Sequence, residues 1–153
     1  MWIASVFEAQ QPIPVKHTCD GENISPLLKF AHVPPEAKTL VLIMDDPDAP
    51  HGTFDHWIVW NLPPDVKEVS EGAPEFKHFS PPPLQGNNGY HVRDYKGPCP
   101  PVGKPHHYHF KLYALDTRLS LPEGSLKEEV EVAMQGHILD QAELVGTYQR
   151  YPR

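Results

Sequence analysis

The sequence predicts a mainly β protein built as an antiparallel β-sandwich, and three observations support this. The chain has 19 prolines among 153 residues, and many of them stand in pairs or triplets. Proline fixes φ and lacks a backbone N–H, so these clusters mark loops. Between them lie short runs of apolar and β-branched residues, and a helical pattern appears only near the C-terminus. Short strands joined by proline-rich turns favour a sandwich over alternating βαβ units.

Six segments are expected to form strands. They span residues 2–8, 28–31, 39–44, 56–62, 107–115 and 146–150. Residues 65–95 are polar and irregular, and they include the triplet Pro81-Pro82-Pro83. We expect this stretch to be mostly loop.

Two helices are expected late in the chain, so the sandwich should carry a C-terminal helical pair. Ser125 and Glu128 have the spacing of a capping box, and Gly136 stands where a helix would end. The apolar face of this first helix consists of Leu126, Val130, Ala133 and Met134. A second helical spacing follows at Ile138, Leu139, Ala142 and Val145.

Length and charge narrow the class of protein. A chain of 153 residues fits one domain over 1–153, and 13 basic against 20 acidic residues give a net charge of −7. This sign, without a basic stripe, disfavours nucleic acid and anionic membrane surfaces as partners. Residues 1–11 lack a signal-peptide pattern, and no apolar run approaches the roughly 20 residues of a transmembrane helix. We expect a cytoplasmic protein with no transmembrane segment.

The two cysteines, Cys19 and Cys99, are too few for a disulfide framework. They can be two free thiols or one bridge, and the sequence leaves both open.

Because side chains alternate between the two faces of a strand, the pattern predicts which polar residues point toward the core. In the strand around 106–115, Phe110, Leu112 and Ala114 share one face with His106 and Tyr108, whereas His107 and His109 lie on the opposite face. Two other strands also carry a polar tip on an apolar face. Leu40, Leu42 and Met44 lead to Asp46, and His56 is expected to share a face with Ile58 and Trp60.

If these tips meet, two imidazoles lie beside a carboxylate over an apolar floor. The simpler interpretation is a buried histidine near an ordinary Asp-Pro-Asp turn. Asp45 and His51 are expected to be solvated loop. The loop "YKGPCPPVG" (95–103) has few backbone donors, held rigidly, which suits either an oxyanion or a purely structural crossover.

Five segments together resemble the signature blocks of the phosphatidylethanolamine-binding protein family, in its short prokaryotic branch, which is related to the Raf kinase inhibitor protein. They are "CDGENISPLL", "DDPDAP", "DHWIVWNLPP", "GPCPPVGKPHHYHFKLYALD" and "GHILDQAELVGTYQR". The resemblance implies a large central sheet packed on a smaller one, with an anion-binding pocket at one end. The implied ligand-binding residues are Asp46, Asp48, Pro50, His56, Gly97, Pro100, Pro101, His106 and Tyr108. With seven residues between Asp48 and His56, the loop is shorter than in mammalian members, so a Raf-type regulatory role is not carried over.

The predicted function is binding of a small anion or phospholipid head group, such as phosphate or phosphoethanolamine, without a cofactor. Asp46 is expected to accept an N–H from His56 or His106, and Asp48 or Trp57 to meet an ammonium group. Three alternatives are weighed. One is a protein-interaction module that inhibits a protease or kinase, with no identified partner. The second is a thiol hydrolase using Cys99 and His106. The third, a metal site, is disfavoured because His107 and His109 face away from His106.

Overall fold

The computed structural model describes residues 1–152 and is built on two antiparallel sheets, which confirms the mainly β prediction. The larger sheet has the strand order β6-β4-β3-β7-β8 and the smaller one β1-β2-β5. The larger contains β3 (Thr39–Asp46), β4 (Phe54–Leu62), β6 (Leu84–Gln85), β7 (His106–Leu115) and β8 (Ile138–Tyr148). The smaller contains β1 (Trp2–Ser5), β2 (Leu28–Ala31) and β5 (Glu68–Val69).

Three short helical segments complete the described chain. They are the α-helix α1 (Lys127–Met134) and two 3-10 turns, η1 (Val15–His17) and η2 (Pro74–Lys77). Within residues 1–152, no helix is long and apolar enough to cross a bilayer.

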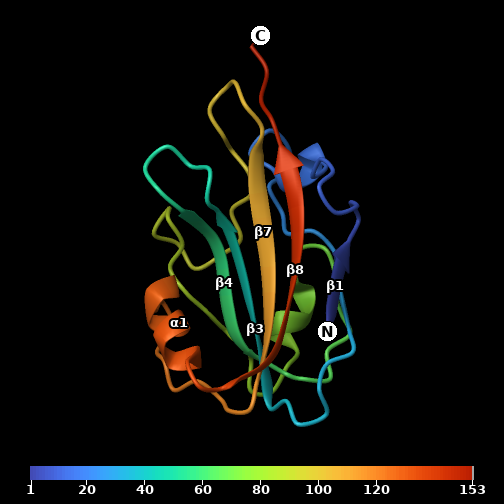
Figure 1. The fold of residues 1–153 in the computed structure, drawn as a ribbon, viewed down its shortest axis with the longest axis vertical. Helices are drawn as coiled ribbons and strands as arrows, with labels where there is room; N and C mark the ends of the chain where they lie inside the picture. The colour runs from blue at the N-terminus through green and yellow to red at the C-terminus, as the bar shows by residue number, and fades with distance from the viewer. Residues whose placement is uncertain (153) are drawn as a thin grey trace.

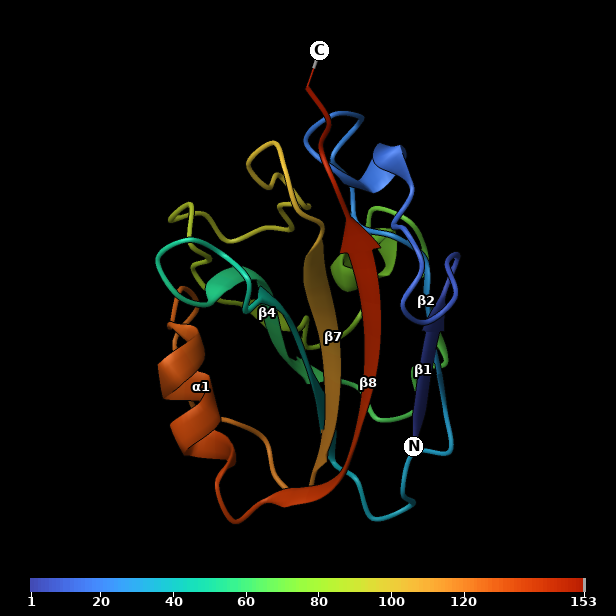
Figure 2. The ribbon, with the colours of Figure 1, turned by 45° about the horizontal axis from the view of Figure 1, so that its top comes forward.

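The larger sheet forms the middle layer of the molecule. In Figure 2, α1 lies on one side of this sheet and β1 and β2 lie on the other. Side chains of β3 alternate between the two faces of the sheet, so the strand contributes to both cores. Leu40, Leu42 and Met44 pack in the core between the sheets. Val41 and Ile43 pack in the core beneath α1. All eight residues of β3 are buried, as expected of a central strand covered on both faces.

The predicted second helix is wrong. Residues 138–148 form β8, which pairs antiparallel with β7 from Ile138 opposite Leu115 to Tyr148 opposite His106. Ile138 and Leu139, which the helical spacing placed on the buried face, are 43% and 41% exposed. The ten-residue edge of β7 offers a complete set of backbone partners, and this tertiary pairing overrides the local pattern.

The first helix exists, but it begins later than the capping-box spacing predicts. The N-cap is Leu126, whose N–H donates to the Glu129 carboxylate at 3.0 Å, and Ser125 Oγ donates instead to the Pro122 carbonyl. Val130 and Met134 are buried as expected, whereas Leu126 is 48% exposed.

Strand β4 contains a bulge that changes the face of His56. Met44 is paired with Trp57 and Asp45 with Asp55, so His56 is the extra residue on β4. Its carbonyl lies outside the β3 ladder and accepts the Lys96 N–H at 3.3 Å. The prediction that His56 shares a face with Ile58 and Trp60 is therefore wrong, because those two residues pack beneath α1.

The strand ends that carry the predicted site lie together. The last residues of β3 and β8 and the first residues of β4 and β7 lie at the same end of the larger sheet, at the top of Figure 1. The β3–β4 loop, the segment leading into β7 and the C-terminal segment all emerge there.

Candidate functional site

A small pocket of about 230 Å³ opens at this end of the larger sheet. Its lining consists of Asp46, Ala49, Pro50, Phe54, His56, Tyr90, Cys99, Pro100, Pro101, His106 and Tyr108. Seven of the nine residues predicted for ligand binding are in this lining, and Asp48 and Gly97 are not. The cavity is smaller than the roughly 300–1,000 Å³ of a drug-sized ligand site, so it suits a small group.

Asp46 ends β3 with a buried side chain, and both of its carboxylate oxygens are occupied. Oδ1 accepts the Asp48 N–H at 2.8 Å, and Oδ2 accepts from His106 Nδ1 at 2.7 Å. The first bond closes the Asp-Pro-Asp turn. The second makes Nδ1 the protonated nitrogen of His106, because a carboxylate only accepts, and so leaves Nε2 for a ligand.

His56 is oriented by backbone rather than by a carboxylate. Its Nδ1 lies 2.6 Å from the Lys96 carbonyl oxygen, so Nδ1 donates and Nε2 is the nitrogen available to the pocket. Burial lowers the pKa of His56, against the opposing effects of the Lys96 bond and of Asp46. His56 is therefore neutral at pH 7.

Aromatic rings surround the two imidazoles. Tyr108 stands edge-on to His56, with centroids 5.3 Å apart, and Phe54 lies 5.0 Å from His56 on another side. Tyr90, which is 48% exposed, packs edge-on against Phe54 at 4.9 Å. Burial raises the pKa of the Tyr108 phenol well above its usual value, which keeps its hydroxyl a neutral donor.

Asp48 lies on the rim and is engaged outside the pocket. Its Oδ2 accepts the backbone N–H of His107 at 2.8 Å and the side-chain Nδ1 at 2.7 Å. The hydrogen bond from His107 lowers the pKa of Asp48, so this carboxylate is ionised. It ties the β3–β4 loop to the start of β7.

Gly97 is also placed outside the pocket lining. Its N–H donates to Asn23 Oδ1 at 2.7 Å, so this donor is not available to a ligand. A Cβ at Gly97 would stand 1.9 Å from the His17 carbonyl oxygen, which means that only glycine fits here. Its role is to let two backbone segments approach closely.

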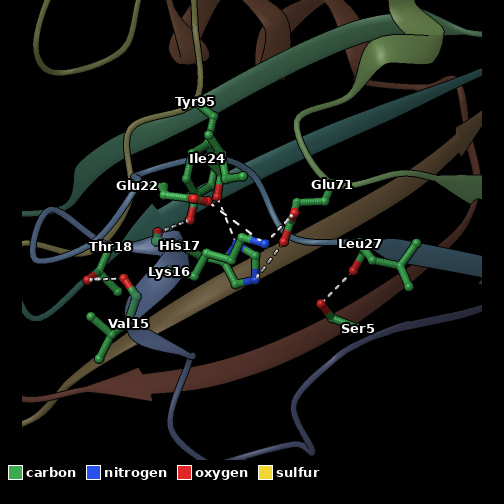
Figure 3. Close-up of polar contacts among 10 residues, drawn as sticks. All are labelled: Ser5, Val15, Lys16, His17, Thr18, Glu22, Ile24, Leu27, Glu71 and Tyr95. Atoms are coloured by element: carbon green, nitrogen blue, oxygen red, sulfur yellow. Dashed lines mark hydrogen bonds and ion pairs between the residues drawn. The ribbon is translucent and has the colours of Figure 1, made fainter.

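η1 and the residues that follow it support the segment that leads into the proline-rich loop. The buried Tyr95 hydroxyl donates to the His17 carbonyl at 2.7 Å, and His17 Nδ1 donates to the Ile24 carbonyl (Figure 3). Lys16 pairs with Glu71 at 2.8 Å in the same region. These contacts fix the backbone from which Pro100 and Pro101 reach the pocket.

Cys19 and Cys99 form a disulfide bridge. A backbone hydrogen bond also joins the two segments, because the Cys19 N–H donates to the Pro98 carbonyl at 3.1 Å. Of the two states that the sequence left open, the structure shows the bridge. Cys99 lines the pocket as half of a disulfide and not as a thiol.

Two further expectations are corrected by burial. Asp45 is 2% exposed and lies in β3, so it is not a solvated loop residue. Trp57 is also 2% exposed, packs between the sheets and donates Nε1–H to Gln85, so it cannot meet an ammonium group.

Four pocket-lining residues were not predicted for ligand binding: Ala49, Phe54, Tyr90 and Cys99, the last of which was expected only as a possible nucleophile. Ala49 stands within the "DDPDAP" block, between two residues that were selected. Phe54 precedes the predicted strand by two residues, and Tyr90 lies in the stretch assigned to loop. Tyr90 could not be predicted as a pocket residue, because an aromatic residue in a polar loop belongs to no periodic pattern.

Within residues 1–152, no three His, Cys, Asp or Glu side chains gather so as to hold a metal ion. A wider groove of about 850 Å³ lies beside Pro12–Val15 and Thr147–Tyr151. Its charged residues Asp20 and Arg150 pair with each other at 3.2 Å, and it has no convergent imidazoles.

The family model described as "Phosphatidylethanolamine-binding protein" matches residues 3–149. The chain belongs to the phosphatidylethanolamine-binding protein family. A UPF0098 protein of Pyrococcus abyssi is 50% identical to this chain, over 97% of this chain and 84% of its own length. A UPF0098 protein of Methanothermobacter thermautotrophicus is 49% identical, over 94% and 95% of the two chains.

Solved structures support the same assignment. A homologue of phosphatidylethanolamine-binding protein from Chlamydia trachomatis superposes with a TM-score of 0.90 at 46% identity, over 97% of each chain. Escherichia coli YbcL, described as a member of the mammalian family, gives 0.87 at 29% identity, over 97% of this chain and 98% of its own. The larger sheet with its smaller partner is therefore the fold of this family.

Proposed function

We propose that the protein binds a small anion, of the phosphate type carried by phospholipid head groups, in the pocket between His56 and His106. The observation that carries the proposal is the Asp46–His106 pair. It fixes the His106 tautomer so that Nε2 is left for a ligand in a small, largely apolar cavity. An imidazole ring that is already oriented loses little entropy when it binds a ligand.

Each oxygen of Asp46 accepts a hydrogen bond within the protein, and the bond from His106 Nδ1 partly offsets the carboxylate charge beside an anion. When the His106 ring is protonated, its Nε2–H can donate to the ligand while Nδ1–H stays bonded to Asp46. The neutral Tyr108 hydroxyl would supply a second donor. Protonation of His56 at Nε2 would supply a third, so anion binding should take up a proton there.

A zwitterionic head group would place its ammonium at the pocket mouth. The exposed face of Tyr90 suits this role, because a cation is attracted to an aromatic ring. Asp48 is less suited, since its carboxylate already pairs with His107.

Calorimetric titration with phosphate, acetate and phosphoethanolamine tests the proposal. We expect the wild-type protein to bind phosphate and phosphoethanolamine, and His106→Ala to lose about tenfold or more in affinity, the worth of one charge-assisted hydrogen bond. His109→Ala is the matched control, because His109 pairs with Glu143 on the opposite face of β7. No binding of any of the three by the wild type would refute the proposal and favour the protein-interaction alternative.

We also propose a binding role rather than catalysis. The thiol hydrolase alternative requires a Cys99 thiolate, and the Cys19–Cys99 bridge removes it. Absence of label from iodoacetamide on the non-reduced protein would support this proposal. Alkylation of Cys99 together with ester hydrolysis would overturn it.

Cytoplasmic localisation is a separate proposal. The disulfide weighs against it in most organisms, because cytosolic thiols are kept reduced, although intracellular proteins of hyperthermophiles are an exception. Cell fractionation, with thiols trapped by alkylation at lysis, gives the compartment and the redox state of Cys19 and Cys99 together.

A further inference from the structure

A buried group of charges lies behind the pocket, on the face of the larger sheet that α1 covers. Lys127 Nζ stands 2.8 Å from Asp55 Oδ1 and 3.3 Å from Asp45 Oδ2. Lys111 reaches the same oxygen of Asp45 at 3.1 Å. The side chains of Lys127 and Asp45 are only 11% and 2% exposed, so these ion pairs are largely removed from water.

Each carboxylate of this group directly precedes a pocket residue. Asp45 is followed by Asp46, and Asp55 is followed by His56, whose side chain the β4 bulge turns toward the pocket. The carboxylates and the pocket side chains therefore leave the same two strand ends on opposite faces of the sheet. Lys127 contacts both strands from the back.

The position of Lys127 is not explained by the stability of α1. Lys127 is the first residue of this helix, where the positive end of the helix dipole disfavours a cation. Burial also acts to lower the pKa of Lys127, but the hydrogen bond with Asp55 and the nearby carboxylates raise it overall. The lysine is thus a charged group held in an unfavourable place by Asp45 and Asp55.

We propose that Lys127 is a positioning residue for the pocket: by pairing with Asp45 and Asp55 it holds the strand ends that present Asp46 and His56. It also offsets two negative charges that lie directly behind the proposed anion site. The electrostatic part rests on the proposed function, whereas the positioning part does not need a ligand.

The pKa of His56 depends on the same charges, so the titration of His56 can be used to test the role of Lys127. The carboxylates Asp46, Asp55 and Asp45 all act to raise its pKa against burial. Other charged groups near these ion pairs are Glu128 and Glu131 on α1, and Lys111 on β7, whose side chain reaches Asp45. Removal of the lysine charge leaves Asp55 without its ion-pair partner and Asp45 with Lys111 alone.

The experiment is a pH titration of the His56 ring by nitrogen-15 NMR, in the absence of ligand. In K127M we expect the His56 titration midpoint to rise by about 0.5 pH unit or more, and the single Nδ1–H tautomer to become a mixture. K127R should restore the wild-type tautomer. D55N, which removes a carboxylate and leaves Lys127 paired with Asp45, should move the midpoint the opposite way and serves if K127M does not fold.

K111M is the matched control, because Lys111 contacts Asp45 and not Asp55; it should leave the His56 tautomer unchanged. Superimposable His56 titrations in wild type, K127M and D55N would overturn the proposal, and so would an equal effect of K111M. Phosphate titration of the same samples at a pH below the His56 midpoint should show several-fold weaker binding in K127M. If wild type does not bind phosphate, the proposed function fails, while the His56 signature still decides the role of Lys127.

Discussion

Both carboxylate oxygens of Asp46 are engaged within the protein, and this decides what the surrounding residues can do. One oxygen closes the Asp-Pro-Asp turn and the other orients His106. His56 receives its orientation from the Lys96 carbonyl and is neutral because it is buried. The two imidazoles are thus oriented by different partners, a carboxylate for His106 and a backbone carbonyl for His56. In both rings Nδ1 is engaged, so Nε2 donates to a ligand only when the ring takes up a proton.

The binding of sulfate should therefore depend on pH through His56. Sulfate keeps its charge in the relevant range, so the protein alone titrates. Burial lowers the pKa of His56, and the imidazolium is the form that donates to an anion. We expect affinity to rise as pH falls below about 6.5, by roughly tenfold for one charge-assisted hydrogen bond.

The measurement is calorimetry over a pH series on wild type and His56→Gln. The glutamine variant should lack the His56 step while keeping any contribution from His106. An identical pH profile in the two proteins would contradict the role given to His56.

Asp48 and Gly97, which the family resemblance implied as ligand-binding residues, do not line the pocket and have partners elsewhere in the protein. Both belong to segments that surround the pocket, but Asp48 binds His107 and the Gly97 N–H binds Asn23. A motif match does not say whether a residue binds the ligand or stabilises the loop beside the ligand. That distinction depends on contacts with distant parts of the chain.

At the scale of elements, α1 matters for the face of the sheet that it covers. Its buried residues Val130 and Met134 pack with Val41 and Ile43 of β3, the strand that ends in Asp45 and Asp46. The helix also delivers Lys127 to Asp45 and Asp55. An element distant from the pocket in sequence thus supports two of its strands.

Two identical substitutions in α1 test how much its packing contributes. Val130→Ala, at a fully buried position, should lower the free energy of unfolding by about 2 kcal/mol. Val132→Ala, at a position that is 66% exposed, should change it by less than about 0.5 kcal/mol. Urea denaturation followed by circular dichroism measures both, and equal losses would show that α1 is not packed as described.

At the scale of the whole molecule, the pocket is assembled from segments that are far apart in sequence. Strand ends of β3, β4 and β7 meet the proline-rich loop, and that loop is tied to the chain near η1 by the Cys19–Cys99 bridge. The bridge joins residues 80 positions apart, so it restricts the unfolded chain strongly.

Reduction of this bridge should cost stability. The chain-entropy model gives a loss of about 4.5 kcal/mol for a separation of this size. Urea denaturation of wild type with and without dithiothreitol measures the loss, and C19A/C99A without reductant should match the reduced wild type. A loss below about 1 kcal/mol in both would show that the backbone contacts of the loop, and not the bridge, hold it in place.

Local sequence patterns predicted the mainly β class and the approximate limits of β3, β4 and β7, and together with the family resemblance they predicted most of the pocket lining. Period-two alternation and proline-marked loops are local properties, so the face of His106 and Tyr108 in β7 could be predicted from them. Three features could be decided only by tertiary structure. Residues 138–148 became a strand because β7 offered an unpaired edge, and His56 turned to the pocket because β4 has one residue more than its partner. Asp45 became a buried ion-pair partner because α1 carries Lys127 to the back of the sheet. Each of these depends on contacts between residues distant in the chain, which local periodicity does not encode.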